Sequence, residues 1–376
     1  MYAISASTKT NSYIHYSRAE TQLPKNAFTV SSHLDMLSAF QFKLPKRLLD
    51  SARVRLSEIQ QQIEEEEEEG EEEGPIVELE DNDDDDSAEI VLAKDISLKK
   101  YTGYRDCHPH FPVKLRLDGK RIIAYELPLG AHAIPCGEIA FAVRTWSNRM
   151  VSLPEFDIVT GPNTYWTCDV AFRPINRPRP APGQGCNSAE EAYPTMVVEV
   201  GVSQSHKSLY RAAAHYFSPR TTIQIYLAIK IFPRRQNGTR AMVALRFLRT
   251  NPNPTRPDIV KSFGTAPIPR QMKYYLQAKH VPDAAITGLR RPGDPPCNAA
   301  DIASYQMNFP AALLFNGDPA GVPGALAAGF NLDLWLVQAA ALMGMLMLRF
   351  RAQSPCWGSS PSLKQSANIH HISDSL

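Results

Sequence analysis

The segment that most restricts the fold of this chain is residues 195–232, TMVVEVGVSQSHKSLYRAAAHYFSPRTTIQIYLAIKIF. It reads as an apolar strand, then a helix, then a second apolar strand. In the helix, expected at 206–217, apolar side chains recur at i, i+3, i+4 and i+7 and form one inward face: Leu209, Ala212, Ala213 and Tyr216. A strand, a helix and a strand in succession predict an α/β fold.

Two carboxylates lie inside the apolar strands of this region. Glu199 stands between valines, and Asp169 belongs to the preceding strand, within YWTCDVAF at 165–172. An unpaired buried carboxylate is costly, so it shifts its pKa or finds a cation. A metal ion is the simplest such cation, and two acids presented from neighbouring strands suit it.

These residues, in this order, resemble a known nuclease family. Asp169, then Glu199-Val-Gly201, then a helix ending in Tyr216 and an apolar strand at 222–232 are similar to the restriction endonuclease domain of the PD-(D/E)XK type. The resemblance is strongest to a fungal branch of that superfamily.

The resemblance covers roughly residues 105–335. It implies an α/β, restriction-endonuclease-like core in which helices flank a mixed central β-sheet. It also implies hydrolysis of phosphodiester bonds in nucleic acid, with Mg²⁺ or Mn²⁺ as the cofactor.

The same resemblance assigns the site residues. Asp169 and Glu199 would ligate the metal through their carboxylates, and Val200 through its backbone carbonyl. Glu138, on a helix expected at 134–148, would act as a base or as a residue outside the first ligand sphere.

One position departs from the family pattern. The usual Lys stands two residues after the Glu, but here that position is Gly201. Lys207 and Arg211, on the helix that follows, are therefore candidates for the cation that stabilises the transition state. The alternative is that both simply face solvent.

Charge is divided unevenly along the chain. Residues 64–89 hold 17 acids and no bases, so the remainder has 39 − 17 = 22 acids against 40 Lys and Arg, a balance of 40 − 22 = +18. Such a balance suits a surface that meets the phosphates of nucleic acid. DNA is expected as the partner before RNA. The acidic run is either a solvated, disordered linker or an internal mimic of nucleic acid that covers a basic groove.

Composition and periodicity predict one main domain with flanking segments. A helical stripe follows Pro45, at Leu48, Leu49, Ala52, Leu56, Ile59 and Ile63. That helix packs on the core, on a second copy in a homodimer, or on nothing lasting. The expected organisation is an irregular region at 1–43, an amphipathic helix at 44–63, an acidic disordered linker at 64–89, the nuclease-like domain at 90–350 and a flexible tail at 351–376.

Other elements are expected around this core. Residues 113–128 predict a hairpin with its turn at Asp118-Gly119-Lys120. The resemblance implies that the Pro- and Arg-rich loop at 173–194 rims the active site, and the alternative is an ordinary exposed insert. Residues 312–319 read as a strand and turn.

Localisation is expected to be intracellular, cytoplasmic or nuclear. The N-terminus has no basic start followed by an apolar run, and the six cysteines form no C-x-x-C pair. The apolar segment 332–348 contains Asp333 and Gln338, so a buried helix capped by Asn331 or Asp333 is favoured over a membrane span.

Two other functions stay open. The missing Lys at position 201 suits an inactive nuclease fold that binds nucleic acid or a protein. Alternatively, the acids are neutralised by basic side chains in a structural or interaction protein.

Overall fold

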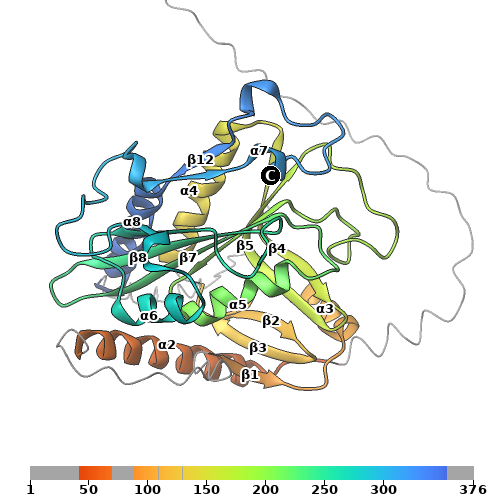
Figure 1. Cartoon of the computed structure of the whole chain (residues 1–376). Coiled ribbons are helices and arrows are strands. Elements are labelled where there is room, and N and C mark those ends of the chain that lie inside the picture. Colours follow the sequence, from red (N-terminus) through yellow and green to blue (C-terminus); the bar gives the residue numbers. More distant parts are fainter. Residues whose placement is uncertain (1–41, 70–88, 109, 129, 354–376) are drawn as a thin grey trace, which may run out of the picture.

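The computed structural model describes residues 42–69, 89–108, 110–128 and 130–353. A central β-sheet runs through it, with helices on both faces (Figure 1). The strands are β1 (Ile90–Ala93), β2 (Lys114–Asp118), β3 (Arg121–Glu126), β4 (Met150–Gly161), β5 (Thr164–Pro174), β6 (Met196–Gly201), β7 (Ile225–Arg234), β8 (Arg240–Leu248), β9 (Ile259–Gly264), β10 (Ile286–Gly288), β11 (Gln306–Phe309) and β12 (Phe330–Asp333). The helices are α2 (Lys46–Glu69), α3 (Leu98–Cys107), α4 (Gly130–Trp146), α5 (His206–Tyr216), α6 (Arg270–Ala278), α7 (Ala311–Leu314) and α8 (Leu334–Gln353).

The central sheet has ten strands in the order β1-β3-β2-β5-β6-β7-β8-β9-β10, with β4 paired to β5 outside this path. Most neighbours are antiparallel, and the parallel pairs are β6 with β7 and β9 with β10. The parallel β6–β7 pair is joined by α5, so the strand, helix and strand expected at 195–232 are present. The predicted α/β class, with a mixed sheet flanked by helices, is confirmed.

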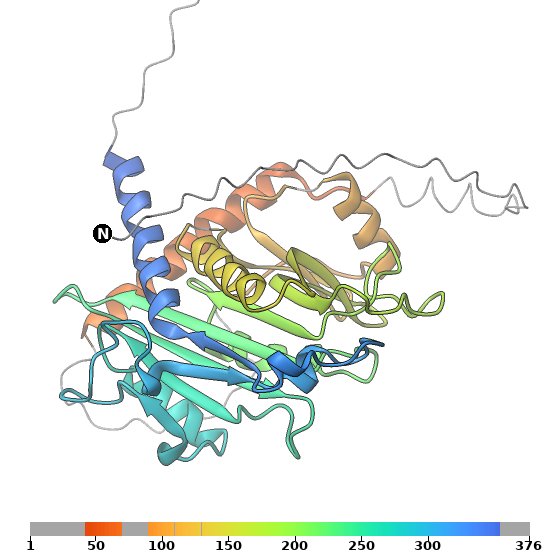
Figure 2. The same cartoon turned by 90° about the horizontal axis from the view of Figure 1, so that it is seen from above.

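Each face of the sheet carries its own apolar core. Alternate side chains of β6 point to opposite faces: Val198 and Val200 pack with α4 and α8, whereas Val197 packs with α5 and α6. Helices α4 and α8 lie next to each other over one face (Figure 2). Because both faces are covered, the middle strands are buried along their whole length.

A third core joins α2 and α3 to the β1-β3-β2 end of the sheet. From α2 it includes Leu49, Ala52, Leu56 and Ile59, and from β2 it includes Leu115 and Leu117. Helix α2 therefore packs on its own chain, the first of the three expectations for it. It also continues to Glu69, into the acidic run, whereas residues 70–88 of that run lie outside the described residues.

Several local expectations are met and others are wrong. The hairpin turn falls at Gly119 and Lys120, both at positive φ, and Asp333 caps α8 by accepting from Trp335 N at 2.9 Å. Helix α4, however, begins at Gly130, not at 134. Residues 311–314 form the short helix α7, not a strand, because the strand β11 ends just before Pro310 and that proline leads into a helical turn.

None of the described helices has the length and apolar character needed to cross a membrane.

Candidate active site

The candidate site lies where two strands of the sheet part. Strand β5 pairs with β6 only from Val170 to Phe172, and beyond this point the β6 edge lacks a strand partner. Here two carboxylates accept hydrogen bonds from the backbone in place of a strand. Asp169 Oδ2 accepts from Val200 N at 2.6 Å, and Glu126 Oε1 accepts from Val202 N at 2.8 Å. We call this point of separation between β5 and β6 the fork. Buried backbone N–H groups need acceptors, so both acids first of all stabilise the fork.

Two basic side chains fill the space between these carboxylates. Lys114 Nζ contacts Asp169 Oδ1 and lies 3.7 Å from Glu126 Oε2. His132 donates from Nδ1 to the Val200 carbonyl at 2.5 Å, and its Nε2 lies 3.0 Å from Asp169 Oδ1. The fork thus holds two acids and two basic side chains within direct contact distance.

The pKa values in the fork follow from these contacts. Burial alone would lower the pKa of Lys114 and of His132, but the charges of Asp169 and Glu126 outweigh it and raise both. Burial would raise the pKa of Asp169, but His132 and Lys114 hold it below its usual range. Lys114 is therefore a firm cation and Asp169 a firm carboxylate.

Glu199 belongs to the same site but has a different environment. It points toward α5, where the hydroxyl of Tyr216 donates to its Oε1. Its Oε2 is buried without a hydrogen-bond partner among the described residues. Burial, and next the charge of Asp169, raise the pKa of Glu199 well above its usual value. A buried carboxyl that is repelled by its neighbour, and whose Oε2 has no donor among the described residues, is the group that a bound cation would stabilise.

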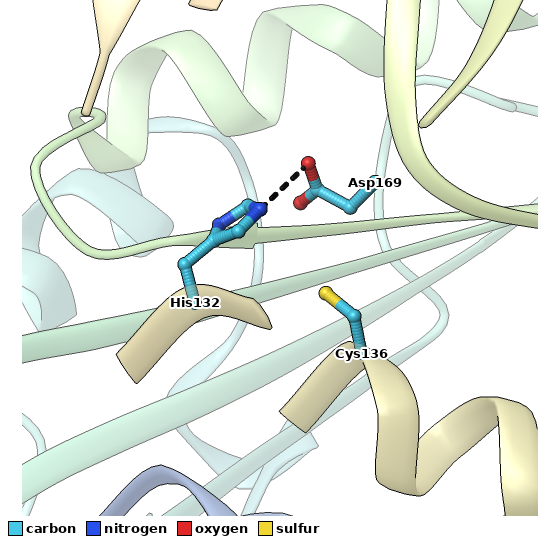
Figure 3. A group of neighbouring side chains, drawn as sticks. All are labelled: His132, Cys136 and Asp169. Carbon is cyan, nitrogen blue, oxygen red and sulfur yellow. Dashed lines mark ion pairs between the residues drawn. The ribbon is translucent and has the colours of Figure 1, made fainter. Parts of the chain in front are cut away.

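Helix α4 contributes a second ligand type. His132 and Cys136 are one helical turn apart and face Asp169, and one ligand atom from each of the three lies within 4.8 Å of the others (Figure 3). Burial, and next Asp169, raise the pKa of the Cys136 thiol well above its usual value. The thiol is therefore protonated, which does not favour a nucleophilic cysteine.

The structure brings together only part of the predicted set. Asp169 accepts from the backbone N–H of Val200, whereas the Glu199 side chain accepts from Tyr216, so a shared metal site of Asp169 and Glu199 stays a prediction. The Val200 carbonyl accepts one hydrogen bond, from His132, and its role as a third metal ligand stays a prediction.

Glu138 does not reach the carboxylates. The face of α4 that packs on the sheet includes His132, Cys136 and Ile139, and Glu138 lies two residues after Cys136, on the other side of the helix. Because α4 begins earlier than expected, His132 takes the position facing Asp169.

The two candidate cations of α5 also lie elsewhere. Arg211 donates to Glu89 at 3.0 Å. Lys207, one turn earlier on the same stripe of α5, is half-buried. The cation beside Asp169 is Lys114 of β2, and a role for Lys207 or Arg211 at the scissile phosphate stays a prediction.

A side chain at position 201 would meet α5. An added Cβ on Gly201 would lie 2.8 Å from Leu209 Cδ1 and 3.3 Å from Gln204. This close approach explains why the residue two positions after Glu199 carries no Lys.

The basic loop 173–194 lies away from the site. It connects the paired ends of β5 and β6, whereas Asp169 and Glu199 stand where the two strands part. Within the loop, Arg173 bonds Glu191 at 2.9 Å. The loop also folds back along β4, where Val159 N donates to the Cys186 carbonyl at 2.6 Å, and its role at the rim of the site stays a prediction.

Sequence reasoning missed Lys114, Glu126 and His132, although a signal existed for two of them. Glu126 ends the apolar strand Ile122–Tyr125, the same pattern that singled out Glu199. The hairpin register pairs Lys114 with Glu126, and opposite charges across a hairpin are expected to interact. No comparable pattern marks His132.

Access to the fork is narrow. Asp169, Glu126 and Glu199 expose only 4%, 0% and 1% of their surface. A cavity of about 60 Å³, lined in part by Lys114, Arg105, Phe111 and Cys168, reaches the site on the Lys114 side. It has room for a few water molecules.

Comparison with solved structures adds a structural likeness. A solved structure described as a "putative nuclease belonging to DUF820", from Anabaena variabilis, resembles part of this chain. The two share 15% sequence identity, with a TM-score of 0.32, over 46% of this chain and 88% of that one. That likeness is distant. No family model and no curated protein matches the sequence, so membership of a fungal branch stays a prediction.

Proposed function

We propose that this protein is a metal-dependent endonuclease that hydrolyses phosphodiester bonds of nucleic acid. The observation that carries the proposal is the contact of Lys114 with Glu126 and Asp169 at one fork of the sheet, with the buried Glu199 on the adjoining strand β6. Several carboxylates and one fixed cation are the side chains that metal-assisted phosphodiester hydrolysis needs.

The donor set suits a hard divalent cation. Asp169 and Glu199 would hold Mg²⁺ or Mn²⁺ through carboxylate oxygens, the ligand type these ions prefer. Glu199 Oε2 supports this assignment, because it is buried with no hydrogen-bond partner in the described chain. When bound, the ion supplies a water of lowered pKa and positive charge beside the phosphate.

The protein's own residues supply the rest. Lys114 is held protonated by Asp169 and Glu126, so it can stabilise charge on a phosphate without changing its own state. His132 links α4 to the β6 edge through the Val200 carbonyl and orients Asp169. The excess of basic residues outside the acidic run supports nucleic acid, DNA before RNA, as the substrate.

A cleavage assay tests the proposal. The full chain is incubated with plasmid and with single-stranded substrates in Mn²⁺, beside Asp169→Asn and Lys114→Met variants that circular dichroism shows to be folded. We expect metal-dependent nicking by the wild type, none by Asp169→Asn, and a loss of about 10²–10³ in rate for Lys114→Met. Equal cleavage by wild type and Asp169→Asn would reject the assignment.

An inactive binding module is the second candidate, and one observation favours it. Lys114 and His132 already pair with Asp169 and Glu126, so those acids are balanced without an ion. Calorimetric titration with Mn²⁺ separates the two functions. Binding that Glu199→Gln abolishes supports the nuclease, whereas no binding together with retained affinity for nucleic acid supports the module.

A further inference from the structure

A second polar site lies on the α5 side of the sheet, beside the fork. It is a groove of about 360 Å³, lined among others by Glu89, Arg116, Arg121, Trp166, Arg211 and His215. Ligand sites are commonly concave and of this order of size, about 300–1,000 Å³. The groove keeps this volume with the Glu89 side chain in place.

Arg116 forms the floor of the groove. It exposes only 3% of its surface, and its guanidinium lies 4.3 Å from the centre of the Trp166 ring. One terminal nitrogen donates to Ser208 Oγ at 3.2 Å. Its Nε is buried without a hydrogen-bond partner in the described chain. A buried guanidinium with unused donor capacity is an anion site.

Glu89 provides the anion. Its carboxylate Oε1 accepts from Arg116, and from Arg211 of α5 at 3.0 Å. Burial would raise the pKa of Glu89, but the charges of Arg116 and Arg211 outweigh it and lower that pKa. The groove therefore already binds one ionised carboxylate, that of Glu89.

The groove and the fork share one face of β2. Lys114 and Arg116 are two residues apart, so their side chains point to the same face, about 7 Å apart along the strand. Leu115 and Leu117 point the other way, into the α2 core. A chain of phosphates that reaches Lys114 can thus place a neighbouring phosphate over Arg116.

We propose that Arg116 and Arg211 form a phosphate-binding subsite for the nucleic-acid backbone, in which Glu89 is an internal stand-in for phosphate. This rests on the proposed function for the class of ligand. Guanidinium groups match phosphate oxygens as well as carboxylate oxygens. Arg121 also lines the groove, where it lies 3.8 Å from the carboxylate of Asp118.

The position of Glu89 in the sequence supports its role. It is the last of the 17 acids at 64–89, and it is the member of that run for which the structure shows the basic partners. The hypothesis that the acidic run mimics nucleic acid therefore gains a defined contact, that of Glu89 with Arg116 and Arg211. It no longer depends on a general attraction between opposite charges.

The test compares Glu89→Gln with Glu58→Gln in the full chain. Both variants remove one negative charge, but Glu58 lies on α2 and pairs only locally, with Arg55 at 3.3 Å. Binding of a short fluorescent single-stranded DNA is followed by anisotropy in EDTA, so that nothing is cleaved. We expect Glu89→Gln to bind about tenfold more tightly than wild type, the worth of one charge-assisted contact, and Glu58→Gln to match wild type.

Two further experiments identify which contact causes the tighter binding of Glu89→Gln. Adding Arg211→Gln to Glu89→Gln should cancel the gain, and inorganic phosphate should compete with DNA for Glu89→Gln at lower concentration than for wild type. Equal affinities for wild type, Glu89→Gln and Glu58→Gln would overturn the proposal, and so would an equal gain in both variants.

The outcome is independent of catalysis. Asp169→Asn should lose cleavage but keep the effect of Glu89→Gln on binding, because Asp169 does not contact the groove residues. An inactive enzyme with a working subsite and an active enzyme without one give different results in these assays.

Discussion

At the scale of single residues, Lys114 decides the charge state of the fork. It is the cation that both Asp169 and Glu126 contact. Removing one partner of a buried ion pair leaves an uncompensated charge, which typically costs about 3–5 kcal/mol. We therefore expect Lys114→Met to lower the free energy of unfolding in urea by that order.

A double variant checks the reason for this loss. Lys114→Met combined with Asp169→Asn removes both charges of the closest pair, so it should recover part of the stability. A loss for Lys114→Met below about 1 kcal/mol would show that the pair is no stronger than an exposed one.

Glu199 is expected to lower stability at neutral pH. Its pKa in the folded protein lies above the usual 4.5, so the folded state holds this proton more tightly than the unfolded chain. The stability that this tighter proton binding contributes is fully present below about pH 4.5 and is lost as the pH rises through the folded-state pKa of Glu199. Glu199→Gln cannot ionise, so we expect its Tm at pH 7 to exceed that of the wild type in EDTA.

The pH dependence and the metal provide the controls for Glu199. The Tm advantage of Glu199→Gln should shrink as the pH falls toward 4.5, and saturating Mn²⁺ should raise the Tm of the wild type but not of the variant. A lower Tm for Glu199→Gln at pH 7 would contradict the assigned pKa shift.

At the scale of elements, the approach of α5 to β6 excludes side chains at position 201. An added Cβ meets Leu209 Cδ1 at 2.8 Å, and Leu209 is itself fully packed. Overpacking of this kind typically costs about 1–3 kcal/mol. We expect Gly201→Ala to lower the free energy of unfolding by that amount, measured in urea. Gly137→Ala is the control, because its added methyl group meets nothing within 4 Å.

The elements that periodicity marks strongly could be predicted from the sequence. Helix α5 shows its buried face in the spacing of Leu209, Ala212 and Tyr216, and the turn before β3 shows itself through Gly119. The starting point of α4 could not be predicted, because neither Gly130 nor its neighbours resemble a capping sequence.

The same contrast holds within the site. Asp169 and Glu199 were found because each interrupts an apolar run. The partnership of Lys114 with Asp169 links residues 55 positions apart, and it depends on where β2 joins β5 in the sheet. No local pattern encodes that choice, so the source of the cation could not be derived from the sequence.

At the scale of the whole molecule, α2 is part of the folded core. Leu56 exposes 1% of its surface among residues of the β1-β3-β2 end, whereas Leu48 on the same helix exposes 37%. Leu56→Ala should therefore cost about 2–5 kcal/mol of unfolding free energy, and Leu48→Ala less than about 0.5 kcal/mol. Both variants are measured by thermal and by urea unfolding. Equal losses of stability for Leu56→Ala and Leu48→Ala would mean that α2 does not pack as described.

Glu89 has one more consequence, through the strand that follows it. It directly precedes β1, which ends the strand order of the sheet and pairs with β3 there. A short edge strand opens more readily than the strands inside the sheet, and its amide hydrogens exchange accordingly. A ligand that displaces Glu89 from Arg116 removes an anchor from β1, so occupancy of the groove should be readable as faster deuterium uptake at Val91 and its neighbours, with no label on the ligand.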